Sequence, residues 1–500
     1  MTRHDPPAGI MDYNSVHDHK NQSHTYPSQS CGVRDSNEKT PILHTGDKTP
    51  LSYGSNGDVN HYDYHTLPYH TASTTITTTT TATRFWILTV FSVLSWVQGV
   101  QWNTWGPISE SMGAAFPGWG SSTVAMMANW GTIMFVVFVF PMCWATQRYG
   151  LRKVVLASTA LIFLGTAIRC VTTAGPVFTI MCHLCAILVG VASTVVLAAP
   201  IVIASDWFPP HERTTALAVM MGTNQLSGVG SYLEPLLVRE PGPDVTVYEI
   251  QSDVMMLMYI GAGISVVLLL AVLVYFPSKP AIPPSLTSST GRLAFQPAFH
   301  TLIKNRCWMW LMVTSGVIVG PFVAWGNVLN YSLLPLGLHQ DDAMWVGQIS
   351  VVLSSLSPVA SGRFNDLVKG HVRSTLILLM LATTICCYWF LLLSYGVLAP
   401  SKWQVYVSVV GGTAFNYATY PLLYEVGVDL AYPAPEILVS GALTAAENLM
   451  STLFLLVFFL PDAGYLWMTY VLVLSTSVTI LPLLLIKFSY VRASIDAPYH

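Results

Sequence analysis

Charge is what this sequence lacks most. Asp, Glu, Lys and Arg make up 9% of its 500 residues, whereas soluble proteins carry roughly 25% because their surfaces must stay hydrated. Hydrophobic residues make up 52% of the chain, and the mean hydropathy is +0.52. With so few charges to hydrate it, most of the surface is expected to face lipid. The sequence therefore predicts an integral membrane protein.

Basic clusters and cysteine patterns are also missing. The net charge is -3, and no run of Lys and Arg suits nucleic-acid binding. The eight cysteines show no metal or disulfide spacing, and Cys182-His183-Leu184-Cys185 lies in an apolar run without further ligands nearby. Nucleophile-elbow, zinc-binding and phosphate-loop motifs are absent as well. We expect no nucleic-acid partner, no metal, no cofactor and no enzymatic activity.

The first 83 residues differ in kind from the rest. They are rich in Ser, Thr, His, Asp, Asn and Tyr, hold 8 of the 14 histidines and end in a threonine run. Such a composition buries too little apolar surface to offset the entropy of ordering. We predict a disordered cytosolic tail over residues 1–83.

Two short patterns in this tail are typical of sorting signals that adaptor proteins read in extended chains. One is an acidic dileucine-type signal, and the other is a tyrosine-based signal; their residues are Glu38, Ile42 and Leu43, and Tyr64 and Leu67. Each pattern also arises by chance. Together they favour a lysosomal or late endosomal membrane over the plasma membrane, with clathrin adaptor complexes as partners.

Twelve apolar runs follow the tail, and a spanning helix needs about 20 such residues. The runs cover residues 85–109, 122–145, 154–174, 177–205, 214–238 and 254–276, then 306–331, 344–361, 373–395, 402–424, 439–460 and 464–487. A polar linker at 277–305 separates the two sets. This layout is typical of two-fold pseudosymmetric transporters. We expect an all-α membrane fold with six-helix bundles at 84–276 and 306–488 and a cytosolic tail at 489–500.

Positive charge is unevenly divided among the loops. Of the sixteen Lys and Arg residues after residue 84, thirteen fall on one side of the predicted spans; only Arg169, Arg239 and Lys402 fall on the other. Cytosolic loops of membrane proteins carry an excess of these residues. The sequence therefore predicts that both termini lie in the cytosol.

Two loops at equivalent places in the two halves carry similar motifs. Arg148-Tyr149-Gly150-Leu151-Arg152-Lys153 follows the second run, with Gln147 where an acid would stand, and Gly362-Arg363-Phe364-Asn365-Asp366 follows the eighth. Both resemble the loop motif of the major facilitator superfamily, in which basic residues meet an acid and a helix end and hold the cytosolic gate shut. We predict gate residues at Arg148, Arg152, Asp366, Arg373, Glu212 and Arg213. The alternative is that these charges only set the topology.

Further motifs narrow the resemblance. They are Trp102-Asn103-Thr104-Trp105-Gly106-Pro107-Ile108, Trp207-Phe208-Pro209-Pro210-His211-Glu212-Arg213, Asn224-Gln225-Leu226, Tyr424-Glu425 and Tyr432-Pro433-Ala434-Pro435-Glu436. Over residues 85–490 this set resembles solute carrier family 49, the feline leukaemia virus subgroup C receptor-related transporters. The resemblance implies a major facilitator fold and transport of a small solute.

The same resemblance implies what is carried. Relatives are associated with choline-like amines and haem, and a lysosomal member with proton-linked export of pyridoxine, vitamin B6. The expected function is therefore proton-linked export of a small vitamin- or amine-like solute, with pyridoxine favoured, from lysosomes to the cytosol. Two alternatives stay open: a uniporter of choline-like cations or haem, and a transporter-like nutrient sensor that signals through its tail.

Polar side chains near the bilayer midplane are the candidates for substrate binding, because substrate sites in such folds lie there between the two halves. The predicted binding residues are Gln98, Trp102, Asn103, Asn224, Gln225, Trp325, Asn416 and Asn448. The resemblance implies an aromatic residue in the first span and a glutamine in the fifth. Trp102 and Gln225 match those two positions best.

Glu447 is the strongest candidate for proton coupling. A carboxylate at mid-bilayer costs at least about 2.5 kcal/mol on insertion scales, so it is expected to face a cavity and to serve a purpose. The alternative is a protonated residue that only packs helices together by hydrogen bonds. Glu234 and Glu425 are weaker candidates for a proton relay, since either could cap a helix or hold a gate.

Overall fold

The computed structural model describes residues 80–486, apart from 232, 290, 334–335, 337–339, 369, 400 and 458–464, together with Arg492. Residues 1–79 of the predicted disordered tail lie outside the described residues, and so do its sorting residues Glu38, Ile42, Leu43, Tyr64 and Leu67. The last predicted tail residue, Thr83, is the first residue of a helix.

The N-terminal half contains helices only, within the part of the chain that the structure describes. In chain order they are α1 (Thr83–Asn103), α2 (Ser109–Ala115), α3 (Ser121–Tyr149), α4 (Leu151–Ile168), α5 (Gly175–Ala198), α6 (Pro200–Trp207), α7 (Arg213–Gln225), α8 (Ser227–Ser231), the 3-10 turn η2 (Glu234–Leu236) and α9 (Val247–Val274). Two short helices, α10 (Leu286–Ser289) and α11 (Phe295–Lys304), lie in the predicted linker.

The C-terminal half repeats this pattern. Its helices are α12 (Arg306–Asn327), α13 (Leu329–Leu333), α14 (Gln340–Leu367), α15 (Val372–Ser394), α16 (Lys402–Tyr417), α17 (Tyr420–Ala431), α18 (Glu436–Leu456) and α19 (Leu466–Leu485). Each of the twelve predicted apolar runs coincides with one helix or with two consecutive helices.

Three of those runs are not continuous apolar helices. Among the described residues, nine helical segments are long and apolar enough to cross a membrane, and the fifth, eighth and tenth predicted runs are not among them. The fifth run is divided into α7 and α8, and the tenth into α16 and α17. The eighth, α14, is 28 residues long but rich in serine. Interrupted helices at membrane depth are tolerated where protein rather than lipid surrounds them.

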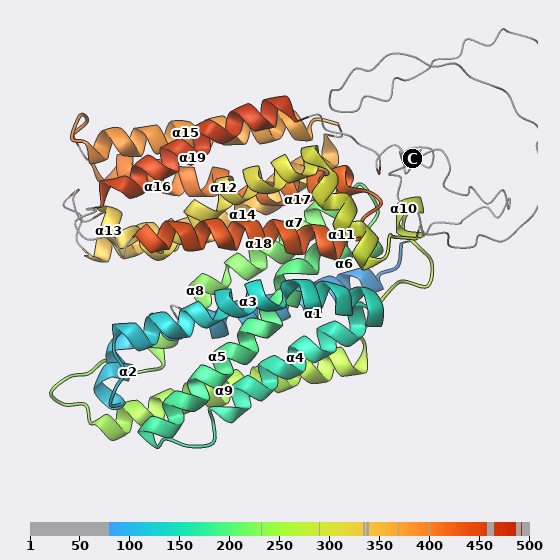
Figure 1. The fold of residues 1–500 in the computed structure, drawn as a ribbon. Helices are drawn as coiled ribbons and strands as arrows, with labels where there is room; N and C mark the ends of the chain where they lie inside the picture. The colour runs from blue at the N-terminus through green and yellow to red at the C-terminus, as the bar shows by residue number, and fades with distance from the viewer. Residues whose placement is uncertain are drawn as a thin grey trace, which may run out of the picture. The chain divides into compact units, whose positions relative to one another are not determined.

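The two halves pack against each other through few helices. α7 contacts α14, and α3 contacts α18, whereas α4, α9, α15 and α19 pack within their own halves. In Figure 1, α10 and α11 lie at one end of the helical body, and α2 and α13 lie at the other. We call these the linker end and the far end.

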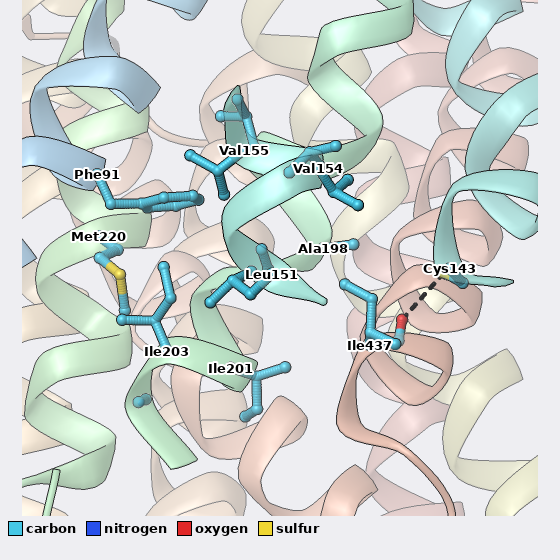
Figure 2. Packing of buried hydrophobic residues seen from close by; sticks show 14 of the residues in the cluster. Phe91, Cys143, Leu151, Val154, Val155, Ala198, Ile201, Ile203, Met220 and Ile437 are labelled. Atoms are coloured by element: carbon cyan, nitrogen blue, oxygen red, sulfur yellow. Dashed lines mark hydrogen bonds between the residues drawn. The ribbon is translucent and has the colours of Figure 1, made fainter. Parts of the chain in front are cut away.

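An apolar core joins the halves near the linker end. One buried cluster runs from Phe91 and Leu151 of the N-terminal half to Tyr424 and Ile437 of the C-terminal half. Within it the Cys143 thiol donates a hydrogen bond to the Ile437 carbonyl oxygen at 3.1 Å (Figure 2). The structure is therefore packed shut across the halves at this depth.

Glycines allow the closest approach between the halves. A Cβ on Gly222 of α7 would lie 2.3 Å from the Ser355 carbonyl oxygen of α14, and one on Gly362 would lie 2.8 Å from the Thr214 carbonyl oxygen. At the other crossing, a Cβ on Gly441 of α18 would lie 2.7 Å from the Cys143 sulfur. Small residues of this kind let membrane helices pack backbone to backbone.

Candidate functional site

Ion pairs gather at the linker end. Arg84, at the start of α1, lies 3.0 Å from Glu212, which precedes α7. Arg213 is 3% exposed and donates a hydrogen bond to the Ser285 hydroxyl of the linker at 3.0 Å. The structure thus places the predicted gate residues Glu212 and Arg213 in contact with α1 and with the linker.

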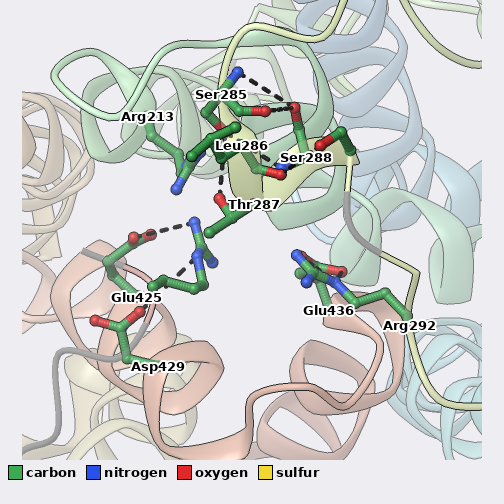
Figure 3. Close-up of polar contacts among 11 residues, drawn as sticks. Arg213, Ser285, Leu286, Thr287, Ser288, Arg292, Glu425, Asp429 and Glu436 are labelled. Atoms are coloured by element: carbon green, nitrogen blue, oxygen red, sulfur yellow. Dashed lines mark hydrogen bonds and ion pairs between the residues drawn. The ribbon is translucent and has the colours of Figure 1, made fainter. Parts of the chain in front are cut away.

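The linker also carries a charged contact to the C-terminal half. Arg292 forms a bidentate ion pair with Glu436, the first residue of α18 (Figure 3). Burial alone would lower the pKa of Arg292, but the carboxylate of Glu436 beside it raises that pKa. The pair is therefore held in its charged form, which favours a stable contact between the linker and α18.

A second acidic site on α17 contacts Arg492. Arg492 is 1% exposed, and its guanidinium lies 3.4 Å from Glu425 and 3.8 Å from Asp429. Figure 3 shows Glu425 and Asp429 side by side on α17. Glu425 is predicted to relay protons, but the structure gives it a basic partner at the linker end. We therefore group Glu425 with the ion pairs that hold this end together.

Asp366 contacts the start of a helix in the other half. Its carboxylate accepts hydrogen bonds from the Thr215 amide at 2.7 Å, the Thr215 hydroxyl at 2.5 Å and the Thr214 amide at 3.3 Å. These amides belong to the first turn of α7, where a negative charge is favourable. The predicted gate residue Asp366 thus joins α14 to α7 across the two halves.

The loop after α3 makes different contacts from its counterpart. The Gln147 side chain donates to the Leu293 carbonyl oxygen of the linker at 2.5 Å, and the Leu293 amide donates to the Pro433 carbonyl oxygen at 3.3 Å. Leu293 therefore lies between the two halves. Arg152 donates to the linker at the Ser278 hydroxyl, 3.1 Å away, through its backbone amide.

The other predicted gate residues have weaker connections. Arg148 is exposed and makes no hydrogen bond or ion pair within the described residues. Arg373 is exposed and donates to the Leu484 carbonyl oxygen at the end of α19. The contact described for Arg373 thus lies within the C-terminal half.

Glu447 lies in the middle of α18 and is 5% exposed. Its two oxygens accept hydrogen bonds from the Ser315 hydroxyl of α12 at 3.0 Å and from the Tyr424 hydroxyl of α17 at 3.1 Å. The Tyr424 hydroxyl also lies 2.7 Å from the Thr444 hydroxyl. The carboxyl group is thus buried among hydroxyls, without a basic partner among the described residues.

A row of tyrosines leads away from Glu447. The ring centroids of Tyr424 and Tyr420 are 6.4 Å apart, and those of Tyr420 and Tyr417 are 5.1 Å apart. Tyr417 interacts with the Gln225 side chain of α7, in the other half. Of these three tyrosines only Tyr424 belongs to a motif noted in the sequence, Tyr424-Glu425. Tyr417 ends α16, and the other two lie four residues apart on one face of α17.

The predicted polar binding residues are spread over both halves. Gln98 is 1% exposed and its amide nitrogen has no partner among the described residues. Asn224 donates to the Ser95 carbonyl oxygen at 3.0 Å, so it ties α7 to α1. Asn416 donates to the Ile318 carbonyl oxygen at 3.0 Å, and Asn448 to the Thr444 carbonyl oxygen at 2.9 Å. Within the described residues, the Gln98 amide nitrogen and the Asn416 side-chain oxygen therefore both have unused hydrogen-bonding capacity.

The predicted aromatic binding residues pack inside their own halves. The Trp102 ring is half-buried and lies against Gly131 of α3, where an added Cβ would come within 2.2 Å of it. Trp325 is 2% exposed and donates to the Ser332 hydroxyl at 2.9 Å. Asn103 is exposed and donates to the Gly99 carbonyl oxygen at 3.0 Å.

The far end holds two buried charges that sequence reasoning did not connect. Glu234 is 5% exposed and accepts a hydrogen bond from the Thr104 hydroxyl at 3.0 Å. Arg169 is 1% exposed, donates to the Gln101 side chain and lies over the Trp105 ring, 5.6 Å from its centroid. The sequence analysis counted Arg169 only as one of three cations on the minority side.

The architecture is that of a major facilitator transporter. The sequence profile of the major facilitator superfamily matches residues 85–455. Among solved structures, the fucose:proton symporter of E. coli superposes with a TM-score of 0.63, at 13% identity, over 81% of this chain and 99% of that one. A proton:xylose symporter superposes with a TM-score of 0.60, at 14% identity, over 83% and 99%. These likenesses establish the fold.

Relatives by sequence define the family more closely. A solute carrier family 49 member 4 homolog of Xenopus tropicalis is 31% identical over 428 residues, which cover 83% of this chain and 93% of the relative. A choline/ethanolamine transporter of Danio rerio is 27% identical over 80% of this chain and 83% of the relative. The chain therefore belongs to solute carrier family 49 of the major facilitator superfamily. It is a multi-pass membrane transporter, and its relatives and fold are those of transporters rather than enzymes.

Proposed function

We propose that this protein exports a small vitamin- or amine-like solute from lysosomes to the cytosol together with protons, and that pyridoxine is the favoured solute. Protons would bind from the acidic lumen and leave on the cytosolic side. The proposal rests on the family membership of the chain and on the chemistry around Glu447.

The carrying observation is the buried carboxyl group of Glu447. It is surrounded by the hydroxyls of Ser315 and Tyr424 and, among the described residues, has no basic partner. Such a group is stable when protonated and costly when charged, because removing an unpaired charge from water is unfavourable. A carboxyl group that changes charge at this position can couple proton movement to a change between two packings of α12, α17 and α18.

The sidedness of the proposal comes from the distribution of charge. The linker end carries most of the Lys and Arg residues that follow the tail, and such residues concentrate in cytosolic segments. We therefore propose that the linker end faces the cytosol and the far end faces the lumen. The apolar contacts across the halves near the linker end, the Asp366 contacts with α7 and the ion pair that joins the linker to α18 favour a state in which the cytosolic side is closed.

A uniporter of choline-like cations is the second candidate. It is favoured by the relatives named as choline/ethanolamine transporters and by the tyrosine row beside Glu447, since electron-rich rings bind organic cations. A uniporter would carry its solute at a rate that a pH gradient leaves nearly unchanged. The pH dependence of uptake therefore separates the two candidates.

The experiment brings the protein to the cell surface and measures uptake. Changing Ile42 and Leu43 to Ala removes the predicted dileucine signal, so the lumenal side faces the medium. If the localisation does not change, that signal is not used. Uptake of labelled pyridoxine is then measured at about pH 5.5 and 7.5, with choline in parallel.

Two variants show where the proton acts. Glu447→Gln keeps the shape of the side chain and one acceptor oxygen, as a protonated carboxyl group would, but cannot bind or release a proton. Glu110→Gln, at an exposed position of α2, is the matched control. We expect acid-stimulated pyridoxine uptake that Glu447→Gln abolishes and Glu110→Gln leaves intact. Absence of pyridoxine uptake at both pH values contradicts the proposed solute, and equal acid stimulation in Glu447→Gln contradicts the proposed coupling residue.

A further inference from the structure

Two opposite charges are buried at the far end without forming an ion pair. Arg169 follows α4 and is 1% exposed, and Glu234 lies in η2 and is 5% exposed. Within the described residues, two guanidinium nitrogens of Arg169 and one carboxylate oxygen of Glu234 have no hydrogen-bond partner. Buried groups of this kind are costly unless they are paired.

Neutral side chains at the end of α1 and just after it form hydrogen bonds with both charged groups. Gln101 accepts a hydrogen bond from Arg169, and Thr104, three residues later, donates one to Glu234 at 3.0 Å. Trp105 follows and presents its ring to the Arg169 guanidinium at 5.6 Å. The field of Arg169 reaches Glu234 even though the two groups do not touch. The end of α1 is thus placed between the two charges.

The geometry points to Arg169 as the counter-charge of Glu234. We propose that the two residues are one ion pair that the end of α1 separates in this structure, and that they contact each other directly in another state of the transport cycle. A direct contact would give the unpartnered Glu234 oxygen and one of the two unpartnered guanidinium nitrogens a partner of opposite charge. Arg169 is therefore a positioning residue that acts on the end of α1 through Gln101 and Trp105.

A proton on Glu234 biases the exchange. When Glu234 is protonated, the hydrogen bond with the Thr104 hydroxyl is enough to stabilise it. When Glu234 is charged, direct contact with the Arg169 guanidinium stabilises it more. Among the other charged groups at this end, Arg239, Glu249 and Asp253 pair with one another. Glu110, Glu240, Asp244 and Lys402 are exposed. The remaining titratable neighbours of Arg169 are the thiols of Cys170, Cys182 and Cys185. No further carboxylate competes for Arg169 among the described residues.

This inference goes beyond the proposed function, which assigns proton coupling to Glu447, and it holds whatever the solute is. Its test therefore uses purified full-length protein in detergent and no solute. The first readout is the midpoint of thermal unfolding for Arg169→Gln, Glu234→Gln and the double variant. The matched pair is Arg239→Gln and Asp253→Asn, an exposed ion pair at the same end.

We expect Arg169→Gln to lower the midpoint strongly and the added Glu234→Gln change to restore most of the loss. A single change leaves one buried charge unpaired, and the double change leaves none. The exposed control pair should show little coupling. Additive losses from Arg169→Gln and Glu234→Gln overturn the pairing.

The second readout follows the end of α1 itself. Gly106 is exposed in the turn after α1, and Gly106→Cys gives a thiol whose rate of modification by a polar reagent is measured at several pH values, relative to a small-molecule thiol. We expect this relative rate to vary with pH by severalfold and to become independent of pH when Glu234→Gln is added. The same pH dependence with and without Glu234→Gln overturns the role of the proton. A merely structural role for Arg169 would move the unfolding midpoint but not this profile.

Discussion

The linker end and the far end differ in how several of their arginines are held. At the linker end, Arg84, Arg292 and Arg492 each have a carboxylate partner, and the partners come from different parts of the chain. At the far end, Arg169 and Glu234 are buried close together, yet each is held by an uncharged group of α1. Ion pairs stabilise the linker end. At the far end, two residues of opposite charge are held apart by the end of α1.

This difference suggests how the transporter has two stable conformations. Interfaces that exchange one set of contacts for another are bistable, because intermediate positions satisfy neither set. Contacts made at the linker end in this structure stabilise its closure, and contacts not yet made at the far end are available for the opposite state.

Breaking the Arg292 pair is expected to have the largest effect. Arg292→Gln leaves the carboxylate of Glu436 buried without its partner, which costs about 3–5 kcal/mol. The measurement is the thermal unfolding midpoint of the purified protein. Arg148→Gln, at an exposed position without a described partner, should leave the midpoint nearly unchanged. Equal effects of the two variants would show that the pair does not fasten this end.

Filling a glycine between the halves comes next. Gly222→Val places side-chain atoms where a Cβ alone would lie 2.3 Å from the Ser355 carbonyl oxygen, and overpacking of this kind costs about 1–3 kcal/mol. Gly242→Val, in open space, is the control in the same unfolding measurement. A neutral Gly222→Val would mean that α7 and α14 are less closely packed than described.

How far the sequence could predict this fold depends on local signals. Twelve apolar runs and the basic loops predict the order of spans, because both signals lie within short segments. The boundaries differ where polar residues continue a helix: α9 begins at Val247, before the predicted 254, because Thr246 and Glu249 form a capping box. The breaks between α7 and α8 and between α16 and α17 leave no strong signal in the pattern of apolar residues. The sequence therefore predicts one span for each of these pairs of helices.

The candidate site was less accessible to sequence reasoning. The contact of Arg292 with Glu436 joins residues 144 positions apart, and no local pattern indicates such a pairing. Arg169 stood out in the sequence only as a cation on the minority side, and nothing nearby in sequence named Glu234 as its neighbour. Trp325, predicted to line the cavity, has a partner for its indole only because Ser332 of α13 folds back onto it. Glu447 was found because a lone carboxyl group in an apolar run is itself a local signal.

A moderate effect is expected from the helix contact of Asp366. Asp366→Asn removes the negative charge at the start of α7, where it accepts two amide hydrogen bonds, and loss of such a cap costs about 1 kcal/mol. The unfolding midpoint should fall less than in Arg292→Gln. Asp244→Asn, at an exposed loop position, serves as the control. A fall in the unfolding midpoint as large as that of Arg292→Gln would show that the Asp366 contacts contribute most to the stability of the linker end.

The smallest effect is expected from the exposed ion pair at the far end. Arg239 is half-exposed and lies 2.7 Å from Asp253, and exposed pairs contribute about 0–1 kcal/mol. Arg239→Gln should therefore change the unfolding midpoint very little, and less still at high salt. A large, salt-sensitive fall in the unfolding midpoint would show that an ion pair also stabilises the far end. The two ends would then not differ in this respect.

Distances between spin labels at the two ends test most directly whether the Arg292–Glu436 ion pair keeps the linker end closed. Spin labels at Tyr149 and Leu367 report the separation of the halves at the linker end, and labels at Val171 and Val397 report it at the far end; all four positions are exposed. The double variant Arg292→Gln/Glu436→Gln removes the ion pair without leaving a buried charge. We predict that it adds a longer distance between the linker-end labels and does not lengthen the far-end distance. An unchanged linker-end distance would contradict the claim that these ion pairs keep that end closed.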